Sequence, residues 1–340
     1  MKSVKKFLKD SKLIWYGVST LILGLLIYFA DVNQFIQALR TVDLFYMSLA
    51  MFFGLSVFLV WGYIWHSFFN NLDIEVSFGK ALHMFMAGNF MNSITPLGQL
   101  GGEPFMAYVV SENTKSSYEK SLSAVMSADL INSIPFMVYA TTGFAYLFIY
   151  GTLNARIEDV IIIVSALSVF VGAIIYLLWF DRKLLEKWSH GIVDFVGDRL
   201  NLTEEFLEPL KEKITEIKDT FESIGEDPRH LLKTATISHL APVTQFICLY
   251  FIMKGLSIEP NFVAIYLTVI LSGLAMFSPT PGGSGTYEAT FAGLLVLFYP
   301  GLGLDKAVAS AVLFRLTTYW PGIPIGYYSL IKLKKTRFTG

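Results

Sequence analysis

The sequence predicts an all-α polytopic membrane protein with about six crossing helices and two re-entrant helical hairpins in an inverted repeat. Three observations lead to this fold class: the composition, a series of apolar runs of membrane length, and a Pro/Gly cluster that occurs twice. Of the 340 residues, 54% are hydrophobic and only 16% are charged, whereas soluble proteins carry about 25% charged residues. The formal net charge of −1 provides no basic surface for nucleic acid. We therefore expect membrane lipids, and no nucleic acid, as partners.

Six apolar runs are long enough to cross a bilayer, because a membrane helix needs about 20 residues. They lie near residues 13–30, 44–69, 119–150, 159–180, 234–253 and 305–331. The first follows the basic segment MKSVKKFLKDSK, which resembles the start of a signal peptide. No small-residue cleavage site follows it, so we expect a retained membrane helix.

Two further apolar regions, 78–112 and 261–299, are each interrupted near the middle by prolines and glycines. The distribution of Lys and Arg favours re-entrant hairpins here, since cytoplasmic loops collect positive charge. With both regions re-entrant, 21 basic residues lie inside the cell and four lie outside. If the first region crossed the membrane, residues 181–233 with their nine basic residues would move outside. The hairpin topology also predicts that both termini are cytoplasmic.

The polar segment 181–230 separates two predicted halves, 44–180 and 231–333, of a single transmembrane domain that covers residues 1–340. Apolar residues in this segment repeat with alternating spacings of three and four, which is typical of one face of a helix. They are Leu207, Leu210, Ile214, Ile217, Phe221 and Ile224. We expect an amphipathic helix at the cytoplasmic face; a partner-binding coiled coil is the alternative.

The interrupting cluster is an internal repeat. Residues 88–107, GNFMNSITPLGQLGGEPFMA, align without gaps with residues 273–292, GLAMFSPTPGGSGTYEATFA, and eight of the twenty positions are identical. The shared pattern includes Thr-Pro-x-Gly-x(4)-Glu, which ends in Glu103 and in Glu288. Three predicted crossings separate the copies, so the two hairpins enter the membrane from opposite sides. Inverted repeats with interrupted helices are typical of transporters.

The helix breakers suggest an anion site. Proline removes a backbone donor and glycine permits positive φ, so each cluster ends one half-helix and begins another. The N–H groups at the start of the second half-helix favour an anion. An intramembrane carboxylate usually faces a cavity or a partner. The alternative is a purely structural hairpin in which Glu103 and Glu288 cap their half-helices.

Each predicted span after a hairpin carries one internal charge, Asp129 in the first half and Arg315 in the second. Each lies nine residues beyond a lysine, Lys120 or Lys306. Glu288 and Arg315 therefore form an opposite pair, whereas Glu103 and Asp129 are both acidic. Two nearby carboxylates favour retention of a proton, so Glu103 and Asp129 are a candidate proton-coupling site. In the alternative, Asp129 is hydrated at the cytoplasmic interface or neutralised by Lys120.

No motif indicates catalysis, a metal or a cofactor. His66, His83 and His239 lie in apolar runs without metal-ligand spacing, and we expect them to pack. The single cysteine, Cys248, excludes a disulfide within the chain. We therefore predict a protein that is not an enzyme and has no metal, cofactor or catalytic residue.

The segments TPLGQLGGEP, SPTPGGSGTYE and LFRLTTYWPGIPIG resemble the transmembrane region of lysylphosphatidylglycerol synthases, over about residues 10–335. This region occurs as the flippase domain of the multiple peptide resistance factor and as stand-alone membrane proteins. The resemblance implies a plasma (inner) membrane protein that moves lipids with modified head groups between leaflets. Many family members have an arginine near the position where this chain has Asp129, so the chain departs from the family pattern there. The aminoacyl-transferring domain of the full synthases is absent from this sequence, so lipid aminoacylation is not expected.

The resemblance and the repeat together give the candidate substrate-binding residues: Thr95, Pro96, Gly98, Gly101, Gly102, Glu103, Thr280, Pro281, Gly282, Gly283, Gly285, Glu288 and Arg315. Pro104 also matches the family motif. We expect a lipid flippase or scramblase in which hairpin N–H groups bind a phosphate and Arg315 supplies the counter-charge. The alternatives are an ion-coupled transporter of a small soluble anion and an intramembrane lipid-modifying enzyme. A homo-oligomer is compatible with the sequence.

Overall fold

A computed structural model describes residues 39–94, 103–150, 223–278 and 280–338, together with positions 21, 36, 37, 169, 173, 176, 215, 219 and 220. Within these residues the chain forms helices and turns and no strand, which confirms the all-α class. The predicted spans 13–30 and 159–180 lie outside the described residues, apart from isolated positions.

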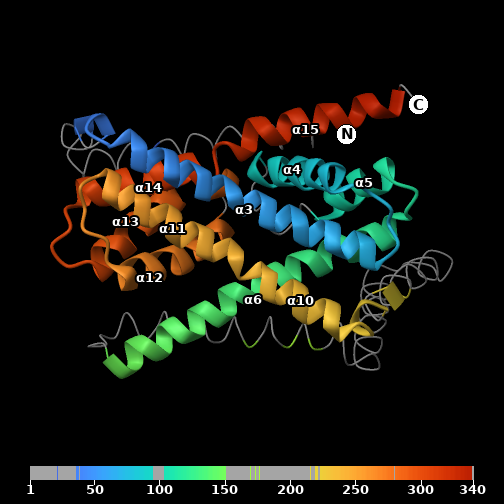
Figure 1. The fold of residues 1–340 in the computed structure, drawn as a ribbon, viewed down its shortest axis with the longest axis horizontal. Helices are drawn as coiled ribbons and strands as arrows, with labels where there is room; N and C mark the ends of the chain where they lie inside the picture. Colours follow the sequence, from blue (N-terminus) through green and yellow to red (C-terminus); the bar gives the residue numbers. More distant parts are fainter. Residues whose placement is uncertain are drawn as a thin grey trace, which may run out of the picture. The chain divides into compact units, whose positions relative to one another are not determined.

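The described helices follow one another as shown in Figure 1. They are α3 (Leu44–Asn71), α4 (Phe78–Ile94), α5 (Glu103–Asn113), α6 (Tyr118–Tyr150), α10 (Pro228–Ser238), α11 (Leu240–Gly255), α12 (Phe262–Ser272), α13 (Thr286–Phe298), α14 (Leu304–Thr318) and α15 (Gly322–Phe338). Two short 3-10 helices, η2 (Gly273–Phe277) and η3 (Pro281–Gly283), lie between α12 and α13. Three described stretches are long and apolar enough to cross a membrane: Leu44–Asn71, Tyr118–Gly143 and Pro228–Gly255. They coincide with three of the predicted spans.

Both interrupted regions form pairs of short helices at the predicted places. The first pair, α4 and α5, has 17 and 11 residues, and the second pair, α12 and α13, has 11 and 13. At 1.5 Å per residue, these helices are about 16–26 Å long, which is less than the ~30 Å of a bilayer core. In the second pair, α12 and α13 pack side by side (Figure 1).

The predicted span 305–331 differs from the structure, because it is divided into α14 and α15. The N–H groups of Tyr319 and Trp320 both donate to the carbonyl of Arg315, at 3.0 and 2.9 Å, which closes the last turn of α14. Pro321 follows, and the residue before a proline is disfavoured in a helix. The chain therefore turns at residues 319–321 before α15 begins.

The chain divides into two compact units. One contains the described parts of 1–63, 79–105 and 239–340, and the other contains those of 64–78 and 106–238. The division by repeat halves stays a prediction. In the first unit, Phe291 and Phe314 form an aromatic contact in the core, with ring centroids 4.9 Å apart. Cys248 is fully buried there, and its Sγ lies 3.1 Å from the Thr317 hydroxyl.

The second unit is built around α6 and α10, which pack against each other. The Ser238 hydroxyl of α10 donates to the carbonyl of Ile131 in α6. His230 contacts the Ser67 hydroxyl at 2.9 Å. Ile224, the one member of the predicted amphipathic stripe that the structure describes, is fully buried. The other members lie outside the described residues.

In the first unit, helix α15 approaches α4 closely through two glycines. A Cβ at Gly322 would lie 2.9 Å from the Asn89 side chain, and a Cβ at Gly326 would lie 2.6 Å from the Phe90 Cβ and closer still to the Met86 carbonyl. The spacing Gly-x(3)-Gly places both glycines on one face, as at close helix contacts in membranes. This contact joins the first hairpin to the end of the chain.

Gly326→Ala is therefore expected to destabilise the protein, by about 1–3 kcal/mol, because the added methyl overpacks the contact with α4. Gly293→Ala is the matched control, since nothing lies within 4 Å of a Cβ at that position of α13. Thermal unfolding in detergent measures both. Equal midpoints for the two variants would contradict a close contact at Gly326.

Candidate functional site

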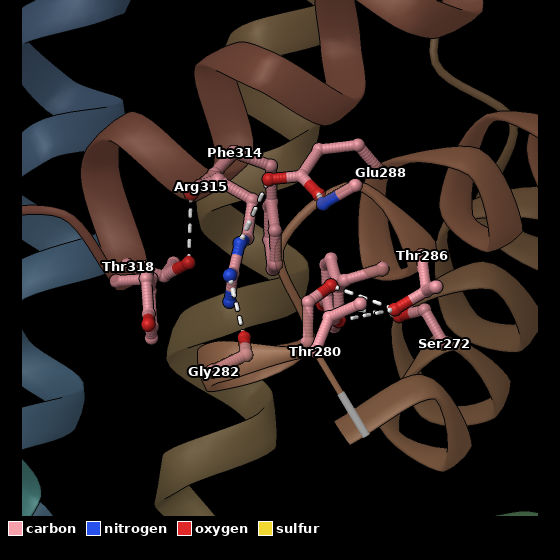
Figure 2. Close-up of polar contacts among 12 residues, drawn as sticks. Ser272, Thr280, Gly282, Thr286, Glu288, Phe314, Arg315 and Thr318 are labelled. Carbon is pink, nitrogen blue, oxygen red and sulfur yellow. Dashed lines mark hydrogen bonds and ion pairs between the residues drawn. The ribbon is translucent and has the colours of Figure 1, made fainter. Parts of the chain in front are cut away.

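The second hairpin contains a buried ion pair. Arg315 Nε, from α14, lies 3.2 Å from Oε1 of Glu288, from α13, and each residue is only 2% exposed. Figure 2 shows the arginine side chain extending from α14 between Glu288 and the hairpin turn. The predicted opposite pair is therefore brought together, and its two charges compensate each other.

Glu288 also caps the helix on which it lies. Its second oxygen, Oε2, accepts a 2.7 Å hydrogen bond from the N–H of Gly285, the residue before α13. The first N–H groups of a helix lack partners within the helix and attract negative charge. The carboxylate of Glu288 thus provides an anion from within the chain at the position where a phosphate was expected.

Arg315 binds the turn as well as the carboxylate. Its Nη2 donates to the carbonyl of Gly282 at 2.8 Å, and Gly282 has a φ of +56°, which favours glycine. The guanidinium carbon also lies 3.5 Å from the ring centroid of Tyr319 and 4.7 Å from that of Tyr287. Aromatic faces attract a cation at these distances. Arg315 is therefore held by a carboxylate, a carbonyl and two rings.

Hydroxyl groups close the turn between η2 and α13. The Thr280 hydroxyl lies 3.0 Å from the hydroxyl of Ser278 and 3.2 Å from that of Thr286. Thr286 in turn donates to the carbonyl of Gly283 at 2.9 Å, and Ser272 donates to the Tyr287 hydroxyl at 3.1 Å; Figure 2 shows Thr280, Thr286 and Ser272 gathered at this turn. These contacts satisfy the hydroxyl groups and one carbonyl of the turn within the protein, as buried polar groups require.

Three N–H groups of the turn already have acceptors in this structure. Those of Gly283 and Ser284 donate to the carbonyls of Thr280 and Pro281, and that of Gly285 donates to Glu288. Glu288 thus lies where the structural alternative predicts, as a cap at the start of its half-helix. Head-group binding at this turn stays a prediction, and it requires some of these contacts to open.

The structure brings together all the predicted site residues of the second hairpin, in the first compact unit. They are Thr280, Pro281, Gly282, Gly283, Gly285, Glu288 and Arg315. Of the first hairpin, Thr95, Pro96, Gly98, Gly101 and Gly102 lie outside the described residues. Glu103 is described as the partly buried first residue of α5.

Asp129 lies in α6, within the second compact unit, where it accepts a 3.3 Å hydrogen bond from the indole N–H of Trp65. Glu103 belongs to the first unit. Their pairing as a proton-coupling site stays a prediction. Trp65 itself is fully buried, so its indole holds one oxygen of the Asp129 carboxylate at the buried face of α3.

The two tyrosines that enclose Arg315 were not predicted from the sequence. Tyr319 follows Arg315 by four residues, which is about one helical turn, and that spacing was the available signal. Tyr287 comes from α13, and nothing in its local sequence indicates a contact with α14. His83 contacts the Ser329 hydroxyl at 2.9 Å. Among the described residues, no cluster of His, Cys, Asp and Glu has the geometry of a metal site.

Arg315→Met is expected to lower the stability by about 3–5 kcal/mol, because it leaves the Glu288 carboxylate buried without a partner. The double variant with Glu288→Gln should recover part of this loss, since it removes the unpaired charge. Thermal unfolding in detergent measures both. Lys254→Met, which removes the exposed pair with Glu259, is the control and should leave the midpoint unchanged. A double variant no more stable than Arg315→Met would contradict the charge argument.

Gly282→Ala is expected to destabilise the hairpin more than Gly301→Ala does. Both glycines have positive φ, +56° and +92°, so both substitutions strain the backbone. Only at Gly282 would the new Cβ overlap the Tyr319 hydroxyl, because nothing lies within 4 Å at Gly301. The difference between the unfolding midpoints of the two variants measures the effect of the contact with Tyr319. Equal decreases in the two midpoints would contradict an overlap at Gly282.

Comparison with known proteins shows which family the whole chain resembles. The profile of the Lysylphosphatidylglycerol synthase TM region matches residues 14–326. A UPF0104 membrane protein of Pyrococcus horikoshii is 27% identical over 345 residues, which covers 98% of each chain. A UPF0104 membrane protein of Methanothermobacter thermautotrophicus is 25% identical over 92% of each chain, and one of Methanocaldococcus jannaschii is 22% identical over 94% of each chain. Because the profile covers nearly the whole chain, this membrane protein belongs to the lysylphosphatidylglycerol synthase transmembrane-region family.

Proposed function

We propose that the protein is a lipid flippase or scramblase that moves phospholipids, or lipids with modified head groups, between the leaflets of the plasma membrane. The observation that supports this most is the second hairpin, in which two half-length helices meet at a turn held by the buried pair of Glu288 and Arg315. The sequence repeats this hairpin motif in the first half, and the predicted topology inverts its orientation. Broken helices that point their ends at a site between inverted repeats are typical of transporters.

The energetic cost of the charges supports the proposal. Taking an arginine and a glutamate out of water costs several kcal/mol for each ion, and their attraction offsets this only with good geometry. A capped hairpin needs no arginine, because a polar side chain also caps a helix. In membrane segments, ionisable groups usually mark a path for a charged substrate. A lipid head group is such a substrate.

A head group with a phosphate and an amine fits the paired charges. The phosphate would take the place of Glu288 beside Arg315, while the amine would take the place of Arg315 beside Glu288. Bidentate contacts between guanidinium and phosphate are among the strong hydrogen bonds in proteins. Glu103 provides the equivalent carboxylate in the first hairpin. In this mechanism the internal pair closes the site when no lipid is bound.

The proposed orientation places both termini in the cytoplasm, and the second unit is consistent with it. A cavity of about 640 Å³ there is lined by Asn71, Asp73, Lys120 and Asp219, among other residues. These residues come from three segments that are far apart in the sequence, and the charge distribution predicts a cytoplasmic place for each of them. Segments on one side of a membrane are able to share a cavity, whereas segments on opposite sides are not.

Lipid translocation in proteoliposomes tests the proposal. Vesicles of phosphatidylethanolamine and phosphatidylglycerol would carry a trace of phosphatidylethanolamine labelled on an acyl chain, which leaves the amine free, and a membrane-impermeant quencher would report the outer leaflet. We expect translocation by the wild type, a loss of at least about tenfold in Arg315→Ala and Glu103→Gln, and no loss in the control Lys254→Met. The tenfold loss corresponds to about 1.4 kcal/mol in the barrier. Unfolding midpoints identify variants that fail to fold.

Wild-type vesicles without translocation, with or without a proton gradient, would contradict a lipid flippase. Uptake of a small anion by the same vesicles would then favour the soluble-anion transporter. A change in the chemical structure of the labelled lipid, followed by mass spectrometry, would instead favour a lipid-modifying enzyme.

A further inference from the structure

We infer that Tyr319 is a positioning residue that couples the two inverted hairpins, so that a movement of one is transmitted to the other. Its effect on transport rests on the proposed function, whereas the coupling itself rests on contacts within the first compact unit. Tyr319 is the residue between α14 and the turn to α15. It contacts both hairpins at once.

The ring and the hydroxyl of Tyr319 bind different hairpins. The ring covers the guanidinium of Arg315 at 3.5 Å, which is held by Glu288 and Gly282 of the second hairpin. The hydroxyl donates to the carbonyl of Ser93 at 3.3 Å, in the last turn of α4 of the first hairpin. The last carbonyls of a helix have no partner within the helix. Tyr319 therefore satisfies an end of the first hairpin while it holds the arginine of the second.

The packing around the hydroxyl leaves little freedom for this link. Tyr319 is 9% exposed and Ser93 is 7% exposed. A Cβ at Gly282 would overlap the Tyr319 hydroxyl and would lie 3.1 Å from the Ser93 carbonyl oxygen. The turn of the second hairpin thus lies directly against the end of the first. A shift of Gly282 must displace Tyr319, Ser93 or both.

The chain beyond Tyr319 reinforces the same link. Gly322 and Gly326 of α15 press against Asn89 and Phe90 of α4. The segment from Tyr319 to Gly326 therefore contacts the first hairpin at both of its ends. Arg315, one turn before Tyr319, contacts the second hairpin. Since tightly packed interfaces change between discrete arrangements rather than deform gradually, a change at the ion pair is transmitted to α4.

The first half of the sequence offers no equivalent residue. When the two halves are aligned on Lys120 and Lys306, Tyr319 corresponds to Ser133, and the Ser133 hydroxyl donates to the carbonyl of Leu130 within its own helix. Among the described residues, the counterpart of Tyr319 therefore makes no link of this kind. Tyr319 thus distinguishes the second half from the first, although both halves carry the same hairpin motif.

Tyr319→Phe tests this inference because it keeps the ring over Arg315 and removes only the hydroxyl. Tyr299→Phe is the matched control, since the Tyr299 hydroxyl also donates to a backbone carbonyl, that of Glu259, at 2.9 Å. Spin labels at Lys80 in α4 and Leu297 in α13, both exposed, would report the distance between the hairpins in a Cys248→Ala background. Translocation of labelled lipid is measured on the same proteins.

We expect the distance distribution to broaden in Tyr319→Phe and to stay as in the wild type in Tyr299→Phe. Translocation by Tyr319→Phe should fall about fivefold, the effect of one ordinary hydrogen bond. An unchanged distribution in Tyr319→Phe would overturn the coupling, whatever the translocation rate. If the wild type moves no lipid but the distribution of Tyr319→Phe still broadens, the coupling holds and the proposed function fails.

Discussion

The ion pair between Glu288 and Arg315 is the interaction on which the second hairpin depends. Where two helix ends meet at a turn, backbone donors and acceptors are left without partners inside the helices. Water satisfies such groups at a surface, but a hairpin inside a membrane must satisfy them within the protein. The carboxylate accepts from Gly285 and the guanidinium donates to Gly282. The same two side chains therefore neutralise each other and complete the backbone of the turn.

This arrangement explains why the second hairpin combines glycines with a buried carboxylate and packs against an arginine of α14. The positive φ values at Gly282, Gly283 and Gly285 direct a carbonyl and an N–H towards the ion pair, and a bulkier residue at Gly282 would collide with Tyr319. Each feature alone would be unfavourable in an apolar helix. Together they form a compact polar centre whose contacts are made inside the protein, and a lipid head group that enters it must replace some of them.

The sequence predicted the helical class, the places of both hairpins and the pairing of Glu288 with Arg315, because these follow from hydropathy, helix breakers and an internal repeat. It did not predict the division of 305–331 into α14 and α15. That run is apolar apart from Asp305, Lys306 and Arg315, and hydropathy does not register that two N–H groups close on the Arg315 carbonyl before Pro321. The role of Tyr287 was equally hidden, since its contact depends on how α13 packs against α14.

The sequence by itself determined that the chain is a helical membrane protein, that it contains an internal repeat, and which charges enter the apolar regions. These properties are local, or arise from comparing one segment with another, so they need no packing. Only the tertiary structure decided that Arg315 is enclosed by two tyrosines, that Glu288 caps its own helix, and that Tyr319 reaches Ser93 of the first hairpin. The contacts of Tyr287 with Arg315 and of Tyr319 with Ser93 join segments far apart in the chain, at 4.7 and 3.3 Å, and only the packing of the helices sets such distances.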